Sequence, residues 1–155
     1  MTKEGKSGFN WNSLGRMAGK FGSKERFVSE ESPLILIADD EDDIKMILGM
    51  YLETCGFRVL TAYDGLDAIE RIKESKPDLI LMDIMMPVLD GVEVTRQIKA
   101  AEDTREIPIV MLTAAAQSEM VERALKAGAE EYIAKPFEPD RVKEIIDRIL
   151  SRKRS

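Results

Sequence analysis

Four short apolar stretches of this chain each lead directly into a side chain that can take part in chemistry. They are Leu34–Ala38 before Asp39 and Asp40, Leu79–Met82 before Asp83, Ile109–Leu112 before Thr113, and Tyr132–Ala134 before Lys135. Apolar runs of this length, bounded by turn signals, are typical of buried parallel strands. An open parallel sheet carries its chemistry just beyond the carboxyl ends of its strands, so the sequence predicts that three carboxylates, a hydroxyl and an ammonium meet at one place.

The three carboxylates indicate a metal site. Clustered acids repel each other strongly in a low-dielectric cleft, so the cluster makes sense around a hard divalent cation. Asp39 and Asp40, together with Asp83, supply oxygen ligands of the kind that Mg²⁺ takes, usually with several waters retained. We therefore expect Mg²⁺ as the cofactor of this site.

The remaining side chains suit phosphoryl transfer. A carboxylate such as Asp83 can attack phosphorus and form an aspartyl phosphate when a cation neutralises it and the incoming oxygens. Thr113 offers a hydroxyl donor, and Lys135 offers an ammonium, to the phosphoryl oxygens. Taken singly, each of the three has an ordinary structural explanation, namely a turn cap, a β-branched strand residue and a surface charge. Their coincidence at the ends of predicted strands favours the phosphoryl site.

The acids that follow Asp40 have a simpler interpretation. Glu41, Asp42 and Asp43 stand at the start of a predicted helix. Negative side chains are favoured at a helix N-terminus by the macrodipole, so we expect these three on a solvated surface.

Strand and helix patterns alternate from Pro33 onward. The predicted strands are Leu34–Ala38, Arg58–Ala62, Asp78–Met82, Ile109–Thr113 and Glu131–Ala134. The predicted helices cover residues 44–55, Gly65–Ser75, Val92–Ala101, a segment capped by Ser118 that ends at Gly128, and Asp140–Ser151. Five strands alternating with five helices through short loops imply right-handed crossovers and a parallel sheet covered on both faces, which is an α/β fold.

Composition narrows the function class. A chain of 155 residues with 44% hydrophobic residues suits one domain with a modest extension, and its net charge of −6 argues against bulk affinity for nucleic acid. No apolar run approaches the roughly 20 residues of a membrane span, and the start does not resemble a signal peptide, so we expect a cytoplasmic protein.

The single cysteine, Cys55, excludes an internal disulfide. The chain has no histidine, so it can form no phosphohistidine intermediate of its own.

The first 32 residues differ from the rest. They contain five glycines, and residues 1–27 hold six Lys and Arg against two Glu, while the remainder holds 17 against 27 Asp and Glu. Because glycine disfavours a stable isolated helix, we predict a flexible, mildly basic extension over residues 1–32. Trp11, Leu14, Ala18 and Phe21 fall near one face at helical spacing, which leaves open a segment that docks on a partner or a membrane surface.

The motifs together closely resemble the receiver domain of bacterial two-component response regulators. The matching residues, in order, are Asp39-Asp40, Asp83 with Met86-Pro87 and Asp90-Gly91, Thr113-Ala114, and Tyr132 with Lys135-Pro136-Phe137. The resemblance covers about residues 33–152, and residues 153–155 form a short basic tail. It implies a flavodoxin-like, doubly wound (βα)5 sandwich whose five-stranded parallel sheet has the order 2-1-3-4-5.

The resemblance also implies a role for each matching residue. Asp83 is similar to the phosphoacceptor of the family, and Asp39 and Asp40 to its metal-binding acids. In the same way, the backbone carbonyl of Met85 corresponds to a further Mg²⁺ ligand, and Lys135 to the residue that pairs with the phosphoryl group.

Two more residues resemble the switch of the family. Thr113 corresponds to the hydroxyl that moves to hydrogen-bond the phosphoryl group, and Tyr132 to the aromatic residue that turns inward behind it. The Lys135–Pro136 bond corresponds to a cis peptide. In family terms, the surface that changes is helix 4, strand 5 and helix 5.

We therefore expect a stand-alone, single-domain response regulator that signals through protein contacts or a phosphorelay. Its phosphodonor is expected to be a sensor histidine kinase, a histidine phosphotransfer protein or a small acyl phosphate. We expect a downstream protein target, no direct DNA binding, and at most a weak or phosphorylation-dependent dimer. Beyond accepting and losing its own phosphoryl group, the chain is not expected to be an enzyme. Met85 and Ala115 flank the site without a group that orients water, which indicates a longer-lived aspartyl phosphate.

Three other functions fit the sequence less well. A Mg²⁺-dependent phosphatase with an aspartyl nucleophile, of the haloacid-dehalogenase type, needs a second Asp two positions on, where this chain has Met85. A degenerate receiver that binds partners without phosphorylation is disfavoured by the complete set of site residues. A nucleotide-binding α/β protein is disfavoured because no Gly-rich phosphate loop follows the first strand.

Overall fold

The computed structural model of the chain describes residues 28–114 and 119–153. The predictions for the flexible extension up to residue 27, with Trp11, lie outside the described residues. The same holds for Ala115, for the helix cap at Ser118 and for residues 154–155.

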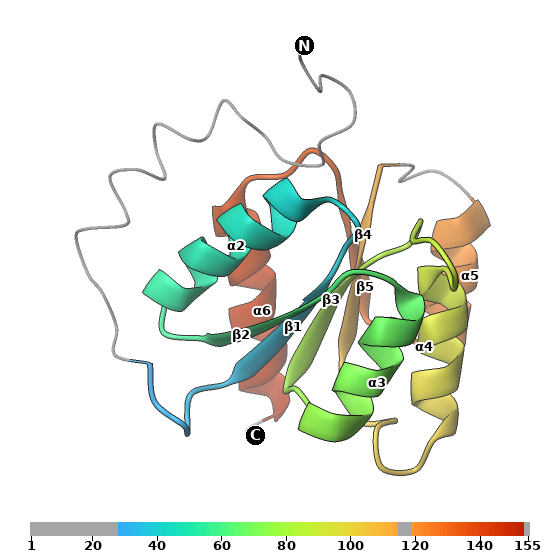
Figure 1. The fold of residues 1–155 in the computed structure, drawn as a ribbon, viewed down its shortest axis with the longest axis horizontal. Coiled ribbons are helices and arrows are strands. Elements are labelled where there is room, and N and C mark those ends of the chain that lie inside the picture. The colour runs from blue at the N-terminus through green and yellow to red at the C-terminus, as the bar shows by residue number, and fades with distance from the viewer. Residues whose placement is uncertain (1–27, 115–118, 154–155) are drawn as a thin grey trace.

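Five parallel strands form one sheet in the order β2-β1-β3-β4-β5, with a helix after each strand (Figure 1). The strands are β1 (Leu34–Ala38), β2 (Arg58–Ala62), β3 (Leu79–Asp83), β4 (Ile109–Thr113) and β5 (Glu131–Ala134). The helices are α2 (Asp42–Thr54), α3 (Gly65–Ser75), α4 (Gly91–Ala100), α5 (Glu119–Ala127) and α6 (Pro139–Lys153). This topology confirms the predicted doubly wound sandwich and its strand order.

The two faces of the sheet are covered by different helices. Along β1, Ile35 and Ile37 pack with α2 and α6, whereas Leu36 and Ala38 pack with the helices of the other layer, α3, α4 and α5 (Figure 1). The alternation follows from the pleat, which sends successive side chains to opposite faces. Because helices cover both faces, β1, β3 and β4 are apolar on both sides, and their reactive residues stand only at the strand ends.

The elements begin and end close to the predicted positions. The side chain of Asp90 caps α4 by accepting from the backbone N–H of Glu93, at 2.9 Å, and Gly128, which follows α5, has φ +120°. Helix α6 runs two residues beyond its predicted end, to Lys153, and basic residues in a last turn are favoured by the helix dipole. None of the helices within residues 28–114 and 119–153 combines the length and apolar character of a membrane span.

The chain enters the domain beside the start of β2. A turn over residues 29–32 is closed by the backbone of Ser32, whose N–H donates to the carbonyl of Ser29 at 3.0 Å. The carbonyl of Ser32 accepts from Nε of Arg58 at 2.8 Å. This contact fixes the point at which the preceding residues leave the domain.

Candidate functional site

The register of the sheet brings the reactive side chains together. Ala38 lies opposite Met82, so Asp39 and Asp83 leave neighbouring strands at the same level. Thr113 lies opposite Ala134, which places Lys135 just beyond the end of β4. The predicted convergence at the carboxyl ends of the strands is therefore what the parallel register produces.

Lys135 lies at the centre of the acids. Its Nζ is 2.9 Å from Oδ2 of Asp39, 3.5 Å from Oδ2 of Asp83 and 3.4 Å from Oε1 of Glu41. The side chains of Asp39 and Asp83 are 0% and 8% exposed, and that of Lys135 is 5% exposed. One buried ammonium thus faces three carboxylates, so the pocket holds more negative than positive charge.

The three aspartates can hold one ion between them. Carboxylate oxygens of Asp39, Asp40 and Asp83 all lie within 4.8 Å of one another. Asp40 is the exposed member of the set, while the other two are buried. Hard oxygen donors at this spacing, with one side open to water, fit the coordination habit of Mg²⁺, so the residues present match the expected cofactor.

The electrostatics of the pocket also fit a cation. Burial, and then the charge of Asp39, raise the pKa of Asp83 to about 7, against the opposing effect of Lys135. Burial likewise raises the pKa of Asp39, although Lys135 and the N–H of Glu41 act in the other direction. For Lys135, burial disfavours the charged form, but its acidic neighbours outweigh burial and raise the pKa. Burial and the charge of Asp39 therefore outweigh the effect of Lys135 at Asp83, and a bound cation would favour the ionised carboxylate.

The loop after Asp83 is tightly fixed. The N–H of Met85 donates to Oδ1 of Asp83 at 3.1 Å, and the N–H of Gly91 donates to the carbonyl of Ile84 at 2.7 Å. A Cβ on Gly91 would lie 2.6 Å from the carbonyl oxygen of Asp83, so only glycine fits there. The side chain of Met85 is 64% exposed, at the outer rim of the site.

Within this loop, Val88 has an unusual backbone. Its φ is +73°, and the N–H of Leu89 donates to the carbonyl of Pro87 at 2.9 Å across it. This combination is a γ-turn of the rare kind that strains a β-branched residue. The strained residue lies five positions after Asp83.

Thr113 and Lys135 are joined through the backbone. The N–H of Lys135 donates to the carbonyl of Thr113 at 2.7 Å, and the Lys135–Pro136 peptide is cis, as the resemblance implied. The side chain of Thr113 is buried at the end of β4. The structure thus places both residues at the same end of the sheet as Asp83.

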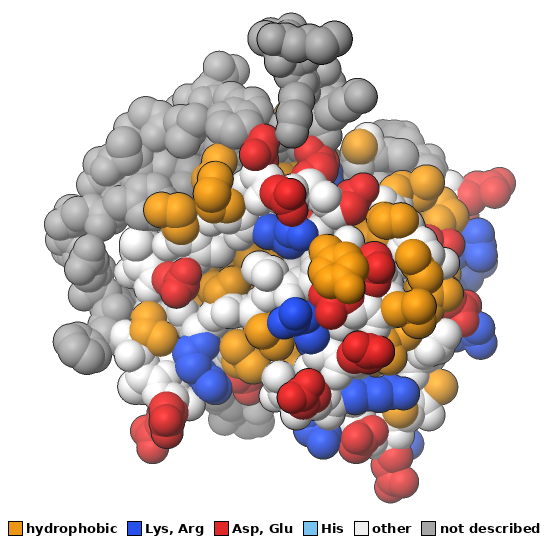
Figure 2. All heavy atoms as spheres, viewed as in Figure 1, with side chains coloured by type: hydrophobic (Ala, Val, Ile, Leu, Met, Phe, Trp, Pro, Cys, Tyr) orange, Lys and Arg blue, Asp and Glu red, His pale blue; other side chains and the backbone are white. Residues whose placement is uncertain are grey.

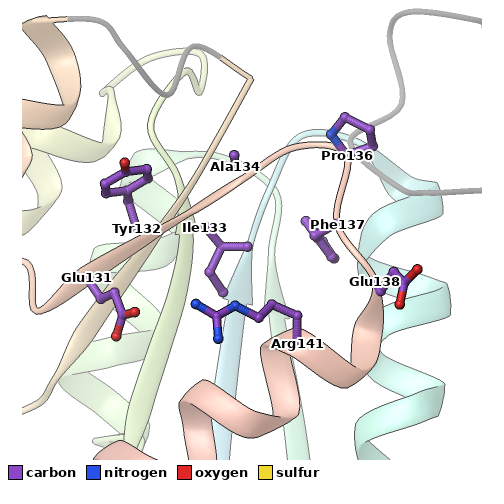
Figure 3. A pocket seen from close by; sticks show the side chains of 8 residues that line it. All are labelled: Glu131, Tyr132, Ile133, Ala134, Pro136, Phe137, Glu138 and Arg141. Atoms are coloured by element: carbon purple, nitrogen blue, oxygen red, sulfur yellow. The ribbon is translucent and has the colours of Figure 1, made fainter.

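Tyr132 lies apart from these groups, on the edge strand β5. It is 40% exposed, and it points to the opposite side of the strand from Ile133 (Figure 3). The strand, the loop after it and the start of α6, with Phe137 and Arg141, line an open groove of about 590 Å³ (Figure 3). Tyr132 is thus in an outward position at a hollowed part of the surface.

Sequence reasoning missed the role of Glu41. The expectation of a solvated side chain was wrong for this residue, because its carboxylate reaches Lys135 inside the site. Asp42 does follow the expectation, with a side chain that is 95% exposed. The position of Glu41, directly after the two metal-site acids, was the only signal in the sequence that could have indicated its contact.

Comparison with known families gives a consistent result. Residues 35–147 match the model of the response regulator receiver domain. The chain is 41% identical over 118 residues to the alkaline phosphatase synthesis transcriptional regulatory protein PhoP of Bacillus subtilis, a match that covers 76% of this chain and 48% of that protein. It is also 41% identical over 115 residues to the phosphate regulon transcriptional regulatory protein PhoB of Escherichia coli, covering 74% of this chain and 49% of that protein. The chain therefore spans about half the length of these curated relatives.

Solved structures agree with the fold, and one of them contains a magnesium ion. The CheY-like receiver domain protein of Methanospirillum hungatei matches with a TM-score of 0.76 at 28% identity, over 80% of this chain and 98% of that one. The receiver domain of a sensor histidine kinase from Pseudomonas aeruginosa matches with a TM-score of 0.71 at 37% identity, over 76% of this chain and 96% of that one. That second domain was crystallised with a magnesium ion coordinated in its active-site cleft.

Proposed function

Because the chain belongs to the response regulator receiver domain family, we propose that it is a phosphorylation-dependent switch whose phosphoryl acceptor is Asp83. The observation that carries the proposal is the position of this carboxylate. It ends the central strand, faces Asp39 and Asp40, and has the ammonium of Lys135 3.5 Å away.

The acceptor reaction needs a nucleophilic oxygen and charge compensation. A carboxylate oxygen of Asp83 forms a bond to phosphorus while the bond from phosphorus to the donor nitrogen breaks, and the electron pair of that bond leaves with the donor imidazole. With an acyl phosphate as donor, the bond that breaks is phosphorus to oxygen. Lys135 is close enough to donate to an oxygen of the new phosphoryl group.

The proposed cofactor is Mg²⁺, held by Asp39, Asp40, Asp83 and the backbone carbonyl of Met85. When bound, it neutralises the carboxylates and the incoming phosphoryl oxygens. Burial and the neighbouring charge of Asp39 raise the pKa of Asp83, and a bound cation would offset both, which supports this assignment. The magnesium ion in the related Pseudomonas aeruginosa receiver domain supports it independently.

The proposed response is a change at β5. The hydroxyl of Thr113 would follow the phosphoryl group, and Tyr132 would move from its outward position into the space behind Thr113. The surface of α5, β5 and α6 would then differ between the two states. The 40% exposure of Tyr132 supports its being the residue with room to change rotamer.

The proposed partners follow from this chemistry. The phosphodonor is a sensor histidine kinase, a histidine phosphotransfer protein or a small acyl phosphate, since the sequence holds no histidine. The output is a contact with a downstream protein, onward phosphotransfer or a phosphorylation-dependent dimer. A stand-alone cytoplasmic regulator without direct DNA binding stays a prediction, because the curated relatives named above are transcriptional regulators and the match spans about half of each.

The test is the intact mass of the protein after incubation with Mg²⁺ and acetyl phosphate. We expect one added phosphoryl group in the wild type and none in Asp83→Asn. The matched control is Asp103→Asn, which alters an acid that is 59% exposed outside the site and should be labelled like the wild type. A phosphoryl adduct that persists undiminished in Asp83→Asn would contradict the assignment.

A further inference from the structure

Helix α2 carries an apolar stripe on its outer surface that the receiver chemistry does not use. Met46 and Met50 are 58% and 53% exposed and lie one helical turn apart, so they share a face. Figure 2 shows apolar side chains gathered over α2, with acidic side chains close to them. Exposed methionines form adaptable contact surfaces, because the thioether chain fits irregular apolar partners.

Acids flank this stripe at both ends. Asp42 and Asp43 precede Met46 by four and three positions, and Glu53 follows Met50 by three, so all three fall on the same side of α2. Lys45 is paired with Asp42 at 3.2 Å. The α2 face, defined as Asp42, Asp43, Met46, Met50 and Glu53, therefore fits a partner that combines apolar and basic side chains.

We propose that the α2 face is the docking site of the N-terminal segment of the same chain, residues 9–24. This segment supplies apolar side chains at Trp11, Leu14 and Phe21, and cations at Arg16 and Lys20. Its glycines disfavour a stable fold of its own, so any order it gains must come from the surface on which it docks. The inference goes beyond the proposed phosphorylation and does not depend on it.

The attachment point of the segment favours this occupant. Residues 29–32 are held beside the start of β2 by the bond between Arg58 and the carbonyl of Ser32. Helix α2 ends at Thr54, only a short loop before β2, so the chain enters next to the C-terminal end of α2. Trp11 lies 17 positions before Val28, which allows a reach of roughly 55 Å, whereas α2 is about 20 Å long. Tethering at this distance also supplies a high effective concentration.

Charge favours the segment over a second copy of the domain. Residues 1–27 hold six Lys and Arg against two Glu, whereas the remainder of the chain holds 17 against 27 acids. Two α2 faces brought together would set their acids against one another, whereas the basic segment would neutralise them.

The fluorescence of Trp11 gives a direct test in the full chain, because Trp11 is its only tryptophan. We expect blue-shifted emission and protection from acrylamide quenching in the wild type. In the double variant Met46→Glu and Met50→Glu, the emission should shift to the red and the quenching constant should at least double. The matched control is Leu125→Glu, which places the same charge at a 40% exposed apolar position of α5, in the other helical layer, and should leave Trp11 unchanged.

A second variant tests the charge contribution without altering the folded domain. Arg16→Glu together with Lys20→Glu should expose Trp11 as the methionine variant does, because the segment would then repel the acids of the α2 face.

Three results would overturn the proposal. The first is a solvent-exposed Trp11 in the wild type, and the second is protection that neither double variant reduces. The third is protection that disappears on dilution, which would show that another copy of the chain holds the segment. Far-UV circular dichroism identifies a variant that has lost its fold.

Discussion

Lys135 and Asp39 form a buried ion pair across the sheet, with Nζ and Oδ2 2.9 Å apart and side chains that are 5% and 0% exposed. Lys135 follows the edge strand β5, and Asp39 follows β1, so the pair closes the pocket from both sides of the central strand. The same ammonium also faces Asp83 and Glu41, which makes it the main source of positive charge for the acids described here.

The first prediction concerns the loss of this cation. In Lys135→Met, two buried carboxylates lose their partner, and removing one member of a buried pair costs about 3 kcal/mol or more of unfolding free energy. Lys143→Met is the control, because it breaks an exposed pair with Asp147 at 2.6 Å and should cost less than about 1 kcal/mol. Urea denaturation without Mg²⁺ at pH 7.5 measures both. Equal losses in the two variants would mean that Lys135 does not stabilise the buried acids.

The second prediction is the pH dependence of stability in the metal-free protein. The pKa of Asp83 is raised to about 7 in the folded state from 3.8, so the folded state binds the extra proton between these values. Stability should therefore fall as the pH rises from about 4 to about 7, and stay at the lower value above that. The Tm of the wild type should show this decrease, and Asp83→Asn should show less of it. A wild type and an Asp83→Asn variant with parallel pH profiles would contradict the raised pKa.

How far the sequence predicts this site depends on the kind of feature. Strand ends were predictable at Asp39, Asp83 and Thr113, because apolar runs stop where a strand leaves the core. The contact between Glu41 and Lys135 could not be predicted, because it depends on backbone geometry. Glu41 occupies the N-cap of α2 with extended φ and ψ of −86° and 114°, and its side chain reaches Lys135 instead of open solvent. The left-handed backbone of Val88 could not be predicted either, since valine is an unusual residue at such a position.

The third prediction follows from Val88. Replacing it by glycine removes the strain of φ +73°, which is worth roughly 1–3 kcal/mol, and part of this gain is lost to the greater freedom of glycine in the unfolded chain. We expect Val88→Gly to raise the unfolding free energy by about 1 kcal/mol. Val88→Ala is the control, because its Cβ still disfavours this φ and it should gain less. If alanine stabilises as much as glycine in thermal denaturation, the backbone at this position is not strained.

The fourth prediction concerns the metal ligands. Mg²⁺ should raise the Tm of the unphosphorylated wild type, because a ligand that binds only the folded state stabilises it by mass action. Asp40→Ala should reduce this shift strongly, since it removes one of the three converging carboxylates. Asp42→Ala, in the same acidic run but with a side chain that is 95% exposed, should retain the full shift. A Mg²⁺ titration that is the same for Asp40→Ala and wild type would place the metal elsewhere.

The fifth prediction concerns how the phosphoryl group is sensed. Thr113 is buried at the end of β4, two positions after Met111, which lies opposite Tyr132 in the sheet. A hydroxyl that moves toward the phosphoryl group would therefore change the packing next to Tyr132. Beryllofluoride, a phosphoryl mimic, should shift the NMR signals of Tyr132 in the wild type, and Thr113→Ala should lose these shifts while the residues around Asp83 still respond.

Thr113→Ser provides the control for this switch, because it keeps the hydroxyl and loses only a methyl group. It should restore the coupling between the two sites even if its stability is lower. Shifts at Tyr132 that are the same in Thr113→Ala and in wild type would show that the signal reaches β5 without the hydroxyl. Wild-type changes confined to the Asp83 pocket would instead mean that the output surface lies away from α5, β5 and α6.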